Sequence, residues 1–314
     1  MMGCHIIKGQ LKKSSRVLNQ SQIDGFDVYQ KNKLIELRLL FAKPKHQIYI
    51  FHQHAMLCNL ILFYLIHVLF SRRKVKIIFD IHDLNELKVN RILLSKLFWC
   101  IHELNEKIAF NLPIGYMTVS KGLSRILYRK NGKNVFILSN ICQPFCNGDY
   151  NSSKLDKLVY FGQVNEERLP IDYIKKLVDK GYQIDLFGTL DSAGKVYLGY
   201  INENANVEFK GEFDAGDIQK IISVYKFSLL CICSKRSNIR FCCPNKLYQS
   251  LSAGIPCVIS NCLKEVMIRF NKKFVVDFES FLLGNVDVSV SPQDYLDIYK
   301  ECSEQYLKFL SDFK

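Results

Sequence analysis

The sequence predicts an α/β protein with two domains, each built on a parallel sheet that helices cover on both faces. Its 314 residues suit two domains of about 150 residues each. Apolar segments of strand length alternate with helix-length segments along nearly the whole chain. The strand segments are continuous apolar runs, which is the pattern of strands buried on both faces. Apolar residues make up 48% of the chain, enough for two packed cores, and this excludes a disordered protein.

The first series of strands and helices occupies the first half of the chain. Strands are expected at 47–52 (QIYIFH), 76–81 (KIIFDI), 115–119 and 134–138, and helices at 55–70, 88–110 and 120–130. The first 45 residues give the weakest pattern, because Lys8, Gly9 and Gln10 follow a short apolar run without a glycine-rich loop. The first βα unit is therefore expected to be reduced.

A polar segment at 142–154, which contains Pro144 and Gly148, separates this series from a second one. The second series has expected strands at 158–161, 183–187, 206–209, 227–233 and 257–260, and helices at 170–180, 214–224 and 244–253. Two successive βα series favour two Rossmann-like domains with parallel sheets that face a central cleft. The predicted domains span residues 1–148 and 149–314, with the last helix packing back on the first domain.

The excess positive charge is confined to the first half of the chain. Residues 1–150 hold 22 Lys and Arg against 9 Asp and Glu, whereas residues 151–314 hold 21 of each. The whole net charge of +13 therefore belongs to the first half. Such an asymmetry favours a surface that meets a polyanion, either nucleic acid or an anionic bilayer. A solvated basic surface that serves solubility is the alternative.

The twelve cysteines are interpreted as reduced, buried, small apolar residues of a cytosolic protein. Most of them lie in apolar runs, and no CxxC pair has a matching second pair, so no zinc or other metal site is expected. The chain is not small, and no signal peptide is recognised, so a secreted disulfide scaffold is not expected.

Two segments of the first half are considered as possible membrane contacts. The apolar run at 55–70 is interrupted by Asn59 and His67 and is shorter than the roughly 20 residues that span a bilayer. A buried crossover helix is therefore favoured over a membrane-dipping one. The helix expected at 120–130 carries Lys121, Arg125, Arg129 and Lys130 on one face and leucine and isoleucine on the other. That pattern suits an anionic leaflet and suits a solvated helix face equally well.

Residues 244–258 (PNKLYQSLSAGIPCV) are the most informative segment of the chain. An amphipathic helix with Leu247, Tyr248 and Leu251 on its apolar side is expected to end at the Ala-Gly pair and to lead into a strand. The segment resembles the donor-binding helix of GT-B glycosyltransferases, especially the family 4-like retaining enzymes (glycosyl transferases group 1). In that family a PNK-aromatic-E segment is followed by AG-x-P.

The resemblance implies that this helix binds a nucleotide diphosphate-sugar through Pro244, Asn245, Lys246, Leu247 and Gln249. Lys246 would meet the diphosphate and Gln249 the ribose hydroxyls. The family usually has a glutamate at the latter position. An amide accepts one hydrogen bond and donates another, so we expect ribose binding to be weakened rather than lost. Apart from the resemblance, these two side chains would be ordinary exposed helix residues.

Further segments carry the same resemblance. Gly162 and Arg168 match the loop Y-x-G-R-x-x-x-x-R that holds the donor diphosphate, where glycine lets backbone approach phosphate and a guanidinium clamps it. Gly188 matches the L-x-G turn that borders the donor pocket. Phe213 lies in the loop after a V-x-F-x-G strand that meets the nucleotide base. His82, after KIIFDI, resembles the histidine that faces the donor sugar from the N-terminal domain.

Several of these assignments have structural alternatives. Arg168 could instead pair with neighbouring carboxylates. His82 could cap its strand or meet Asp83. His52 and His54 also follow a strand and could line the acceptor side.

The resemblance covers residues 47–262 and implies a hexosyltransferase-type enzyme. It would move a sugar from a nucleotide diphosphate-sugar to a glycan or lipid-linked acceptor in cell-surface polysaccharide synthesis. It would retain the anomeric configuration and need no metal and no cofactor besides the donor substrate. Residues 1–148 would form the acceptor side and hold the enzyme at the cytoplasmic face of an anionic membrane.

Three positions depart from the family. Gln163, Phe241 and Gln249 stand where a charged residue is usual, which makes a catalytically inactive GT-B interaction or regulatory subunit the alternative function. A nucleic-acid partner is not expected, since the basic half lacks a recognisable reading motif. The chain also lacks a P-loop, a GxGxxG fingerprint and a GxSxG elbow.

Overall fold

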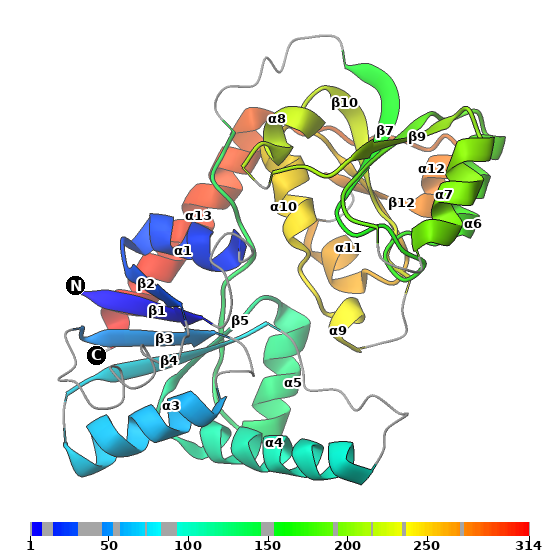
Figure 1. Ribbon diagram of the computed structural model, residues 1–314. Coiled ribbons are helices and arrows are strands. Elements are labelled where there is room, and N and C mark those ends of the chain that lie inside the picture. Colours follow the sequence, from blue (N-terminus) through cyan, green and yellow to red (C-terminus); the bar gives the residue numbers. More distant parts are fainter. Residues whose placement is uncertain are drawn as a thin grey trace. The chain divides into compact units, whose positions relative to one another are not determined.

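The computed structural model describes residues 2–7, 15–30, 46–52, 57–72, 74–82, 93–145, 154–190, 194–214, 216–233, 237–270 and 273–313. Its chain divides into two compact units, Met1–Ser139 with Ser303–Lys314, and Asn140–Cys302. Each unit contains a six-stranded sheet in which neighbouring strands run parallel (Figure 1). The α/β class predicted from the continuous apolar runs is confirmed.

The sheet of the first unit has the strand order β2-β1-β3-β4-β5-β6. Its strands are β1 (Gly3–Ile7), β2 (Asp27–Gln30), β3 (Ile48–His52), β4 (Lys76–Ile81), β5 (Gly115–Thr118) and β6 (Phe136–Ile137). The last four confirm the predicted strands. β1, α1 (Ser15–Asp24) and β2 form a complete βα unit, so the expectation of a reduced unit is wrong. β1 coincides with the short apolar run expected before Lys8, and its His5 is buried with a hydrogen bond to the distant His52.

Helices cover both faces of this sheet. They are α1, α3 (Leu57–Phe63), the π-helix η3 (Tyr64–Phe70), α4 (Leu93–Asn111), α5 (Lys121–Asn131) and the end of α13 (Pro292–Asp312). In Figure 1, α1 and α13 lie on one side of the sheet, and α3 and α4 lie on the other. Tyr306 of α13 joins the core formed by Ile50 and Ile78, whereas Phe63 of α3 packs on Tyr49 of the opposite face.

The helix predicted at 55–70 is only half buried. Leu57, Leu60 and Phe63 pack inward, but Leu62 and Phe70 are exposed. The expectation of a buried crossover helix is therefore correct for one face and wrong for the other. No described helix is long and apolar enough to cross a membrane.

The helix predicted at 120–130 is confirmed as α5. The Ser120 hydroxyl caps it by accepting a hydrogen bond from the Leu123 backbone amide (3.2 Å), and Gly132 ends it at φ 68° in the left-handed region. Leu123 and Leu127 are buried, and the predicted row of four basic residues is exposed: Lys121, Arg125, Arg129 and Lys130.

The sheet of the second unit has the order β12-β11-β10-β7-β8-β9. Its strands are β7 (Leu155–Phe161), β8 (Ile184–Phe187), β9 (Val207–Gly211), β10 (Tyr225–Leu230), β11 (Cys257–Ile259) and β12 (Val275–Asp277). Its helices are α6 (Ile171–Asp179), α7 (Gly194–Glu203), α8 (Ile218–Ile222), α9 (Ser237–Arg240), α10 (Asn245–Ser252), α11 (Lys264–Phe270), α12 (Phe278–Leu282) and the start of α13. β7 to β11 confirm the five predicted strands. The sequence did not predict α7, α9, α11, α12 or β12. The predicted linker at 142–154 lies partly outside the described residues.

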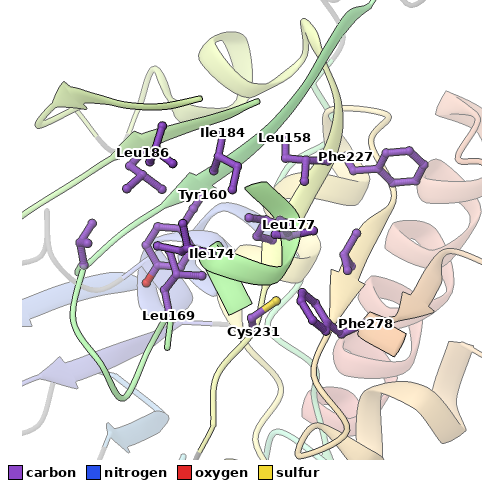
Figure 2. Packing of buried hydrophobic residues seen from close by; sticks show 14 of the residues in the cluster. Leu158, Tyr160, Leu169, Ile174, Leu177, Ile184, Leu186, Phe227, Cys231 and Phe278 are labelled. Atoms are coloured by element: carbon purple, nitrogen blue, oxygen red, sulfur yellow. The ribbon is translucent and has the colours of Figure 1, made fainter. Parts of the chain in front are cut away.

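Both faces of the second half of β7 are buried, which explains the continuous apolar run at 158–161. Leu158 and Tyr160 point to one face, where α6 contributes Ile174 and Leu177 (Figure 2). Val159 and Phe161 point to the other face and pack with two isoleucines of α8. Successive side chains of a strand alternate between faces, so a strand covered on both sides is apolar at every position.

All eleven cysteines among the described residues are free thiols. Cys231 and Cys257 are buried in the second unit, as predicted. Cys58, Cys100 and Cys233 are exposed, so the expectation of burial is wrong for these three.

Candidate functional site

Three loops meet at the carboxyl edge of the second sheet. Gly162 follows β7, Gly188 follows β8, and Gly211 ends β9. The Gly162 amide donates to the Phe187 carbonyl (2.8 Å), and the Gly188 amide donates to the Gly211 carbonyl (2.8 Å). In open parallel sheets, ligands bind beyond this edge.

Two of these positions require glycine. Gly188 has φ +142°, and a Cβ there would lie 1.8 Å from the carbonyl oxygen of Gly162. Gly162 has φ +121°, and its Cβ would lie 2.4 Å from both Cε and Nζ of Lys246. The missing side chains thus let the β7 and β8 loops pack together and let Lys246 lie against them.

Lys246 stands in the first turn of α10, which packs through buried Leu247 and Leu251. Its Nζ lies 4.1 Å from the centroid of the Tyr160 ring and 5.8 Å from that of Phe161, a cation–π arrangement. Burial, followed by the positive charge of Arg168, lowers the pKa of Lys246 to about 7. Within the described ranges, no hydrogen bond or ion pair is made by the Lys246 ammonium.

Arg168 lies in the loop between β7 and α6. Its backbone amide donates to the Asn165 side-chain oxygen (3.0 Å), which holds the loop in place. The nearby Glu166 carboxylate accepts from the Tyr197 hydroxyl (2.8 Å) and the Ile171 amide (3.3 Å) instead of pairing with Arg168. As far as the structure describes the chain, Arg168 forms no ion pair, which disfavours the carboxylate alternative.

The α10 helix begins at Pro244 and Asn245, as the motif predicts. Gln249 is partly buried one turn after Lys246, and its backbone oxygen accepts from the Ser252 hydroxyl (2.9 Å). Phe213 packs edge-on against Phe161, with ring centroids 6.3 Å apart, so its ring extends the core beneath the loops.

In the first unit, His82 directly follows β4 and is 16% exposed. Its Nε2 lies 2.8 Å from Oδ2 of Asp80. Asp80 is fully buried and receives two hydrogen bonds from Arg16, Nε to Oδ2 (2.9 Å) and Nη2 to Oδ1 (2.8 Å). His52, the register partner of Asp80 on β3, adds Nδ1 at 2.9 Å from the same Oδ2.

The protonation states of this cluster follow from burial and charge. Burial alone would raise the pKa of Asp80, but the charges of Arg16 and His82 and the histidine hydrogen bonds outweigh it and hold the pKa well below its usual range. Burial lowers the pKa of His52 to about 3, so this ring is neutral near pH 7. Asp80 is therefore a buried anion that is balanced mainly by Arg16.

The hydrogen bonds continue behind Asp80. His52 Nε2 lies 2.9 Å from His5 Nδ1, and His5 Nε2 lies 3.0 Å from the Asp24 carboxylate. The Tyr306 hydroxyl of α13 donates to the same carboxylate (2.8 Å). Among the side chains joined by these hydrogen bonds, only His82 has appreciable exposure, so a substrate can reach the series at His82.

His52, Asp80 and His82 also offer three atoms within 4.8 Å of one another, a spacing at which a metal ion could be considered. However, both histidines already direct a nitrogen to the same Asp80 oxygen, and the Arg16 guanidinium binds both carboxylate oxygens. A cation would have to displace a buried arginine. The arrangement fits a hydrogen-bonded network better than a metal site.

His82 lies at a strand end, as predicted, but its hydrogen-bond partner Asp80 was not predicted. Asp83, the expected neighbour, and His54 lie outside the described residues. The sequence contains one sign of this role: Asp80 is a carboxylate within the buried strand KIIFDI, and a buried charge requires a partner. His52 is 1% exposed and supports Asp80, which disfavours its expected place on the acceptor side.

The first unit also contains a cavity of about 230 Å³. It is lined by Tyr64, Val68, Val75, Lys76, Ile77, Pro113, Ile114 and Phe313. Five of them, at 75–77 and 113–114, directly precede or begin β4 and β5, so the cavity lies at the amino edge of the sheet, whereas His82 lies at the carboxyl edge.

Two parallel sheets with covering helices also occur in solved glycosyltransferase structures that match this chain, and these matches identify the GT-B fold. Over 98% of its length the chain matches the structure of AviGT4, a glycosyltransferase involved in avilamycin A biosynthesis, and covers 96% of it with a TM-score of 0.64 and 11% identity. It also matches an alpha-glucosyltransferase in complex with UDP-glucose and DNA containing an abasic site, with a TM-score of 0.60, 10% identity, and coverage of 99% and 95%. A structure of alpha-glucosyltransferase (AGT) in complex with UDP matches with a TM-score of 0.59, 10% identity, and coverage of 100% and 96%.

No protein-family model and no curated protein sequence matches the chain. At 10 to 11% identity the structural matches establish the fold and not the family. The expectation that nucleic acid is no partner finds no support, because one of the matched structures contains DNA.

Proposed function

We propose that the protein is a glycosyltransferase that binds a nucleotide diphosphate-sugar at the carboxyl edge of the second sheet. The observation that carries the proposal is the pair of cations there, Lys246 and Arg168, which have no carboxylate partner within the described part of the chain. Two unpaired cations beside a glycine turn suit the two negative charges of a diphosphate ester. The UDP complexes among the matched folds support uridine as the first nucleotide to test.

The diphosphate would lie against Gly162, between Lys246 and Arg168. The α10 helix begins beside Lys246, and the positive end of its dipole would add to the charge compensation. These groups supply the charge compensation that a metal ion supplies elsewhere, so we propose metal-independent transfer. Gln249 would meet the ribose, and Gly188 and Phe213 would border the nucleotide.

His82 would act on the donor sugar from the first domain. Because its Nε2 is committed to Asp80, its Nδ1 remains for a sugar hydroxyl or the leaving-group side. Asp80 fixes the orientation of the ring through this hydrogen bond. We further propose that the anomeric configuration is retained, as in the enzymes that the motif at 244–258 resembles.

The proposed acceptor is a glycan or a lipid-linked sugar in cell-surface polysaccharide synthesis, reached at the inner face of the cell membrane. DNA is a second candidate acceptor, favoured by the net charge of +13 in the first half of the chain and by the DNA-bound alpha-glucosyltransferase of the same fold. Transfer of labelled sugar to a lipid-linked extract or to duplex DNA would separate the two acceptors.

Calorimetry with a panel of UDP- and GDP-sugars tests the donor site directly. We expect one of them to bind the wild type and to bind Lys246→Met about 10- to 100-fold more weakly, because a hydrogen bond to a charged group contributes about 1.5–3 kcal/mol. Lys226→Met, which removes an exposed lysine from the same unit, is the matched control. If no nucleotide sugar binds at millimolar concentration while the protein stays folded, the donor-site proposal fails and an inactive GT-B relative is the better interpretation.

A further inference from the structure

Exposed apolar side chains gather on one pair of helices of the first unit. Six large apolar residues with exposed fractions between 39% and 75% belong to α3, η3 and α4, and we call them the α3–α4 face: Leu62, Leu69, Phe70, Ile101, Leu104 and Ile108. Elsewhere in the described residues, exposed apolar side chains are scattered over several elements. Exposed apolar side chains that are grouped in this way on a protein surface mark an interaction site.

The spacing of these residues shows that the face is a regular feature of α4. Ile101, Leu104 and Ile108 stand at i, i+3 and i+7, and they therefore lie on one side of the helix. Ala109 and Phe110 are buried on the other side. An apolar stripe normally faces a protein core, but this one is exposed in the folded unit.

The two helices adjoin each other. The Asn105 side chain of α4 donates to the sulfur of Cys58 on α3 (3.2 Å), and Figure 1 shows α3 and α4 side by side beneath the sheet. Leu62, Leu69 and Phe70 are exposed on the α3–η3 segment, which lies beside α4. The exposed apolar residues of both helices therefore belong to neighbouring elements of one unit.

Basic residues surround this surface. Exposed Arg72 and Lys74 lie two and four residues after Phe70. The α5 helix exposes its own basic row beside α4, and Lys130 of that row forms an ion pair with Glu106 of α4 (3.5 Å). The two acids of α4 are both engaged: Glu103 pairs with Lys107 (3.4 Å) and Glu106 with Lys130. The cations nearby are therefore in excess, in agreement with the charge of +13 in residues 1–150.

We infer that the α3–α4 face inserts into the head-group boundary of an anionic lipid bilayer. Apolar side chains gain by leaving water, and the surrounding cations meet lipid phosphates. DNA would attract the cations but offers no apolar environment for Phe70 and Leu104. A second copy of the chain would cover the apolar residues but would bring two sets of cations together. The inference builds on the proposed membrane location, to which it adds the contact surface and the lipid charge.

Flotation with lipid vesicles tests the inference in the full chain. Wild type is expected to bind vesicles of equal parts phosphatidylglycerol and phosphatidylcholine, to bind pure phosphatidylcholine weakly, and to dissociate from the anionic vesicles as salt is raised. Phe70→Ser with Leu104→Ser should reduce binding about tenfold or more, since both side chains lose their apolar burial. Ile268→Ser with Leu283→Ser, at 76% and 75% exposure in the second unit, is the matched control and should bind as wild type does.

Three results would overturn the inference. They are wild type that does not float with anionic vesicles, a Phe70/Leu104 variant that floats like wild type, and a concentration-dependent dimer that this variant abolishes. The last result would assign the face to a second copy of the chain. Nucleotide-sugar binding is measured on the same samples. If no sample binds a nucleotide sugar but wild type floats with anionic vesicles, the transferase proposal fails and the membrane inference holds. If nucleotide sugar binds but wild type does not float, the membrane inference fails and the transferase proposal holds.

Discussion

The ammonium group of Lys246 lies 4.1 Å from the centre of the Tyr160 ring, with the charge of Arg168 nearby and no carboxylate to balance it among the described residues. A buried ammonium in this setting is poorly solvated, which is why its pKa falls to about 7. The two cations are held in place by Gly162, Asn165 and α10 before any ligand arrives. A bound anion would relieve the unfavourable electrostatics of the free protein.

Donor binding should depend on pH through Lys246. At pH 8 to 9 the amine of the free protein is mostly neutral, whereas a bound diphosphate stabilises the ammonium form, so binding takes up a proton. Affinity for a UDP-sugar should therefore fall by up to about tenfold per pH unit above pH 7 and change little just below it. Calorimetry in buffers of different ionisation enthalpy measures the proton uptake. Lys246→Arg, whose guanidinium stays charged, should show none, and proton release by wild type would contradict the assignment.

Gly162→Ala should cost stability and donor affinity together. Its φ of +121° is unfavourable for alanine by about 1–3 kcal/mol, and the new methyl group would collide with Lys246 at 2.4 Å. Thermal unfolding and donor calorimetry measure the two effects. Gly199→Ala in α7 has no heavy atom within 4 Å of the new methyl group and should stabilise the fold by about 0.5–1 kcal/mol. Equal behaviour of the two variants would show that the Gly162 backbone is not constrained as described.

Asp80→Asn should destabilise the protein by about 3–5 kcal/mol, because it leaves the Arg16 guanidinium as an unbalanced buried charge. The pKa of Asp80 is depressed in the folded state, so its stabilisation is fully present above the unfolded pKa of about 4 and is lost as the pH falls through the folded value. The variant should therefore lack that part of the acid sensitivity of wild type. Asp156→Asn, which removes an exposed pair with Lys226 (3.0 Å), should cost less than about 1 kcal/mol.

His82→Ala should lower turnover by about 100-fold and leave the donor dissociation constant within about twofold. Asp80 keeps Arg16 and His52 in this variant, so the fold should stay intact, as circular dichroism would show. Steady-state kinetics measures the turnover, and calorimetry measures the donor dissociation constant separately. Unchanged turnover would remove His82 from the reaction.

Gln249→Glu should tighten donor binding by about fivefold. A carboxylate accepts hydrogen bonds from both ribose hydroxyls, and such charged hydrogen bonds exceed neutral ones by about 1 kcal/mol. The gain should appear with UDP and vanish with pyrophosphate, which has no ribose. Gln293→Glu, on the exposed start of α13, should change neither affinity. A gain for both ligands would show that Gln249 does not face the ribose.

The fold was largely predictable because burial on both faces leaves a strong trace in the sequence. β4 and β7 contain uninterrupted apolar runs, at 77–79 and 158–161, and no other class of structure explains such runs as well. The βα unit that contains Arg16 was less predictable. Arg16 reaches Asp80 across 64 residues, and only the folded chain brings the two together.

The candidate donor residues were proposed from the resemblance to GT-B motifs, in which Lys246 and Arg168 each follow a strand of one parallel sheet. The supporting contacts were not predictable, because the approach of Gly188 to Gly162 depends on backbone angles that glycine permits but does not dictate. Periodicity also predicted helix 88–110 without revealing that Leu104 faces solvent. An apolar stripe in a sequence shows which side of a helix is apolar, but it does not show whether that side faces the core or the solvent.

The membership of α13 in both units has a consequence for biosynthesis. Tyr306 and Leu310 complete the core of the unit that is translated first, and Tyr306 closes the hydrogen bonds around Asp24. Domains generally fold from the N-terminus as the ribosome releases them. Here the N-terminal unit must wait for residues 303–314, while Asn140–Cys302 is already complete. The nascent chain would therefore complete the sequence of its second unit before that of its first, and a ribosome stalled before residue 303 would hold an N-terminal unit with an open core.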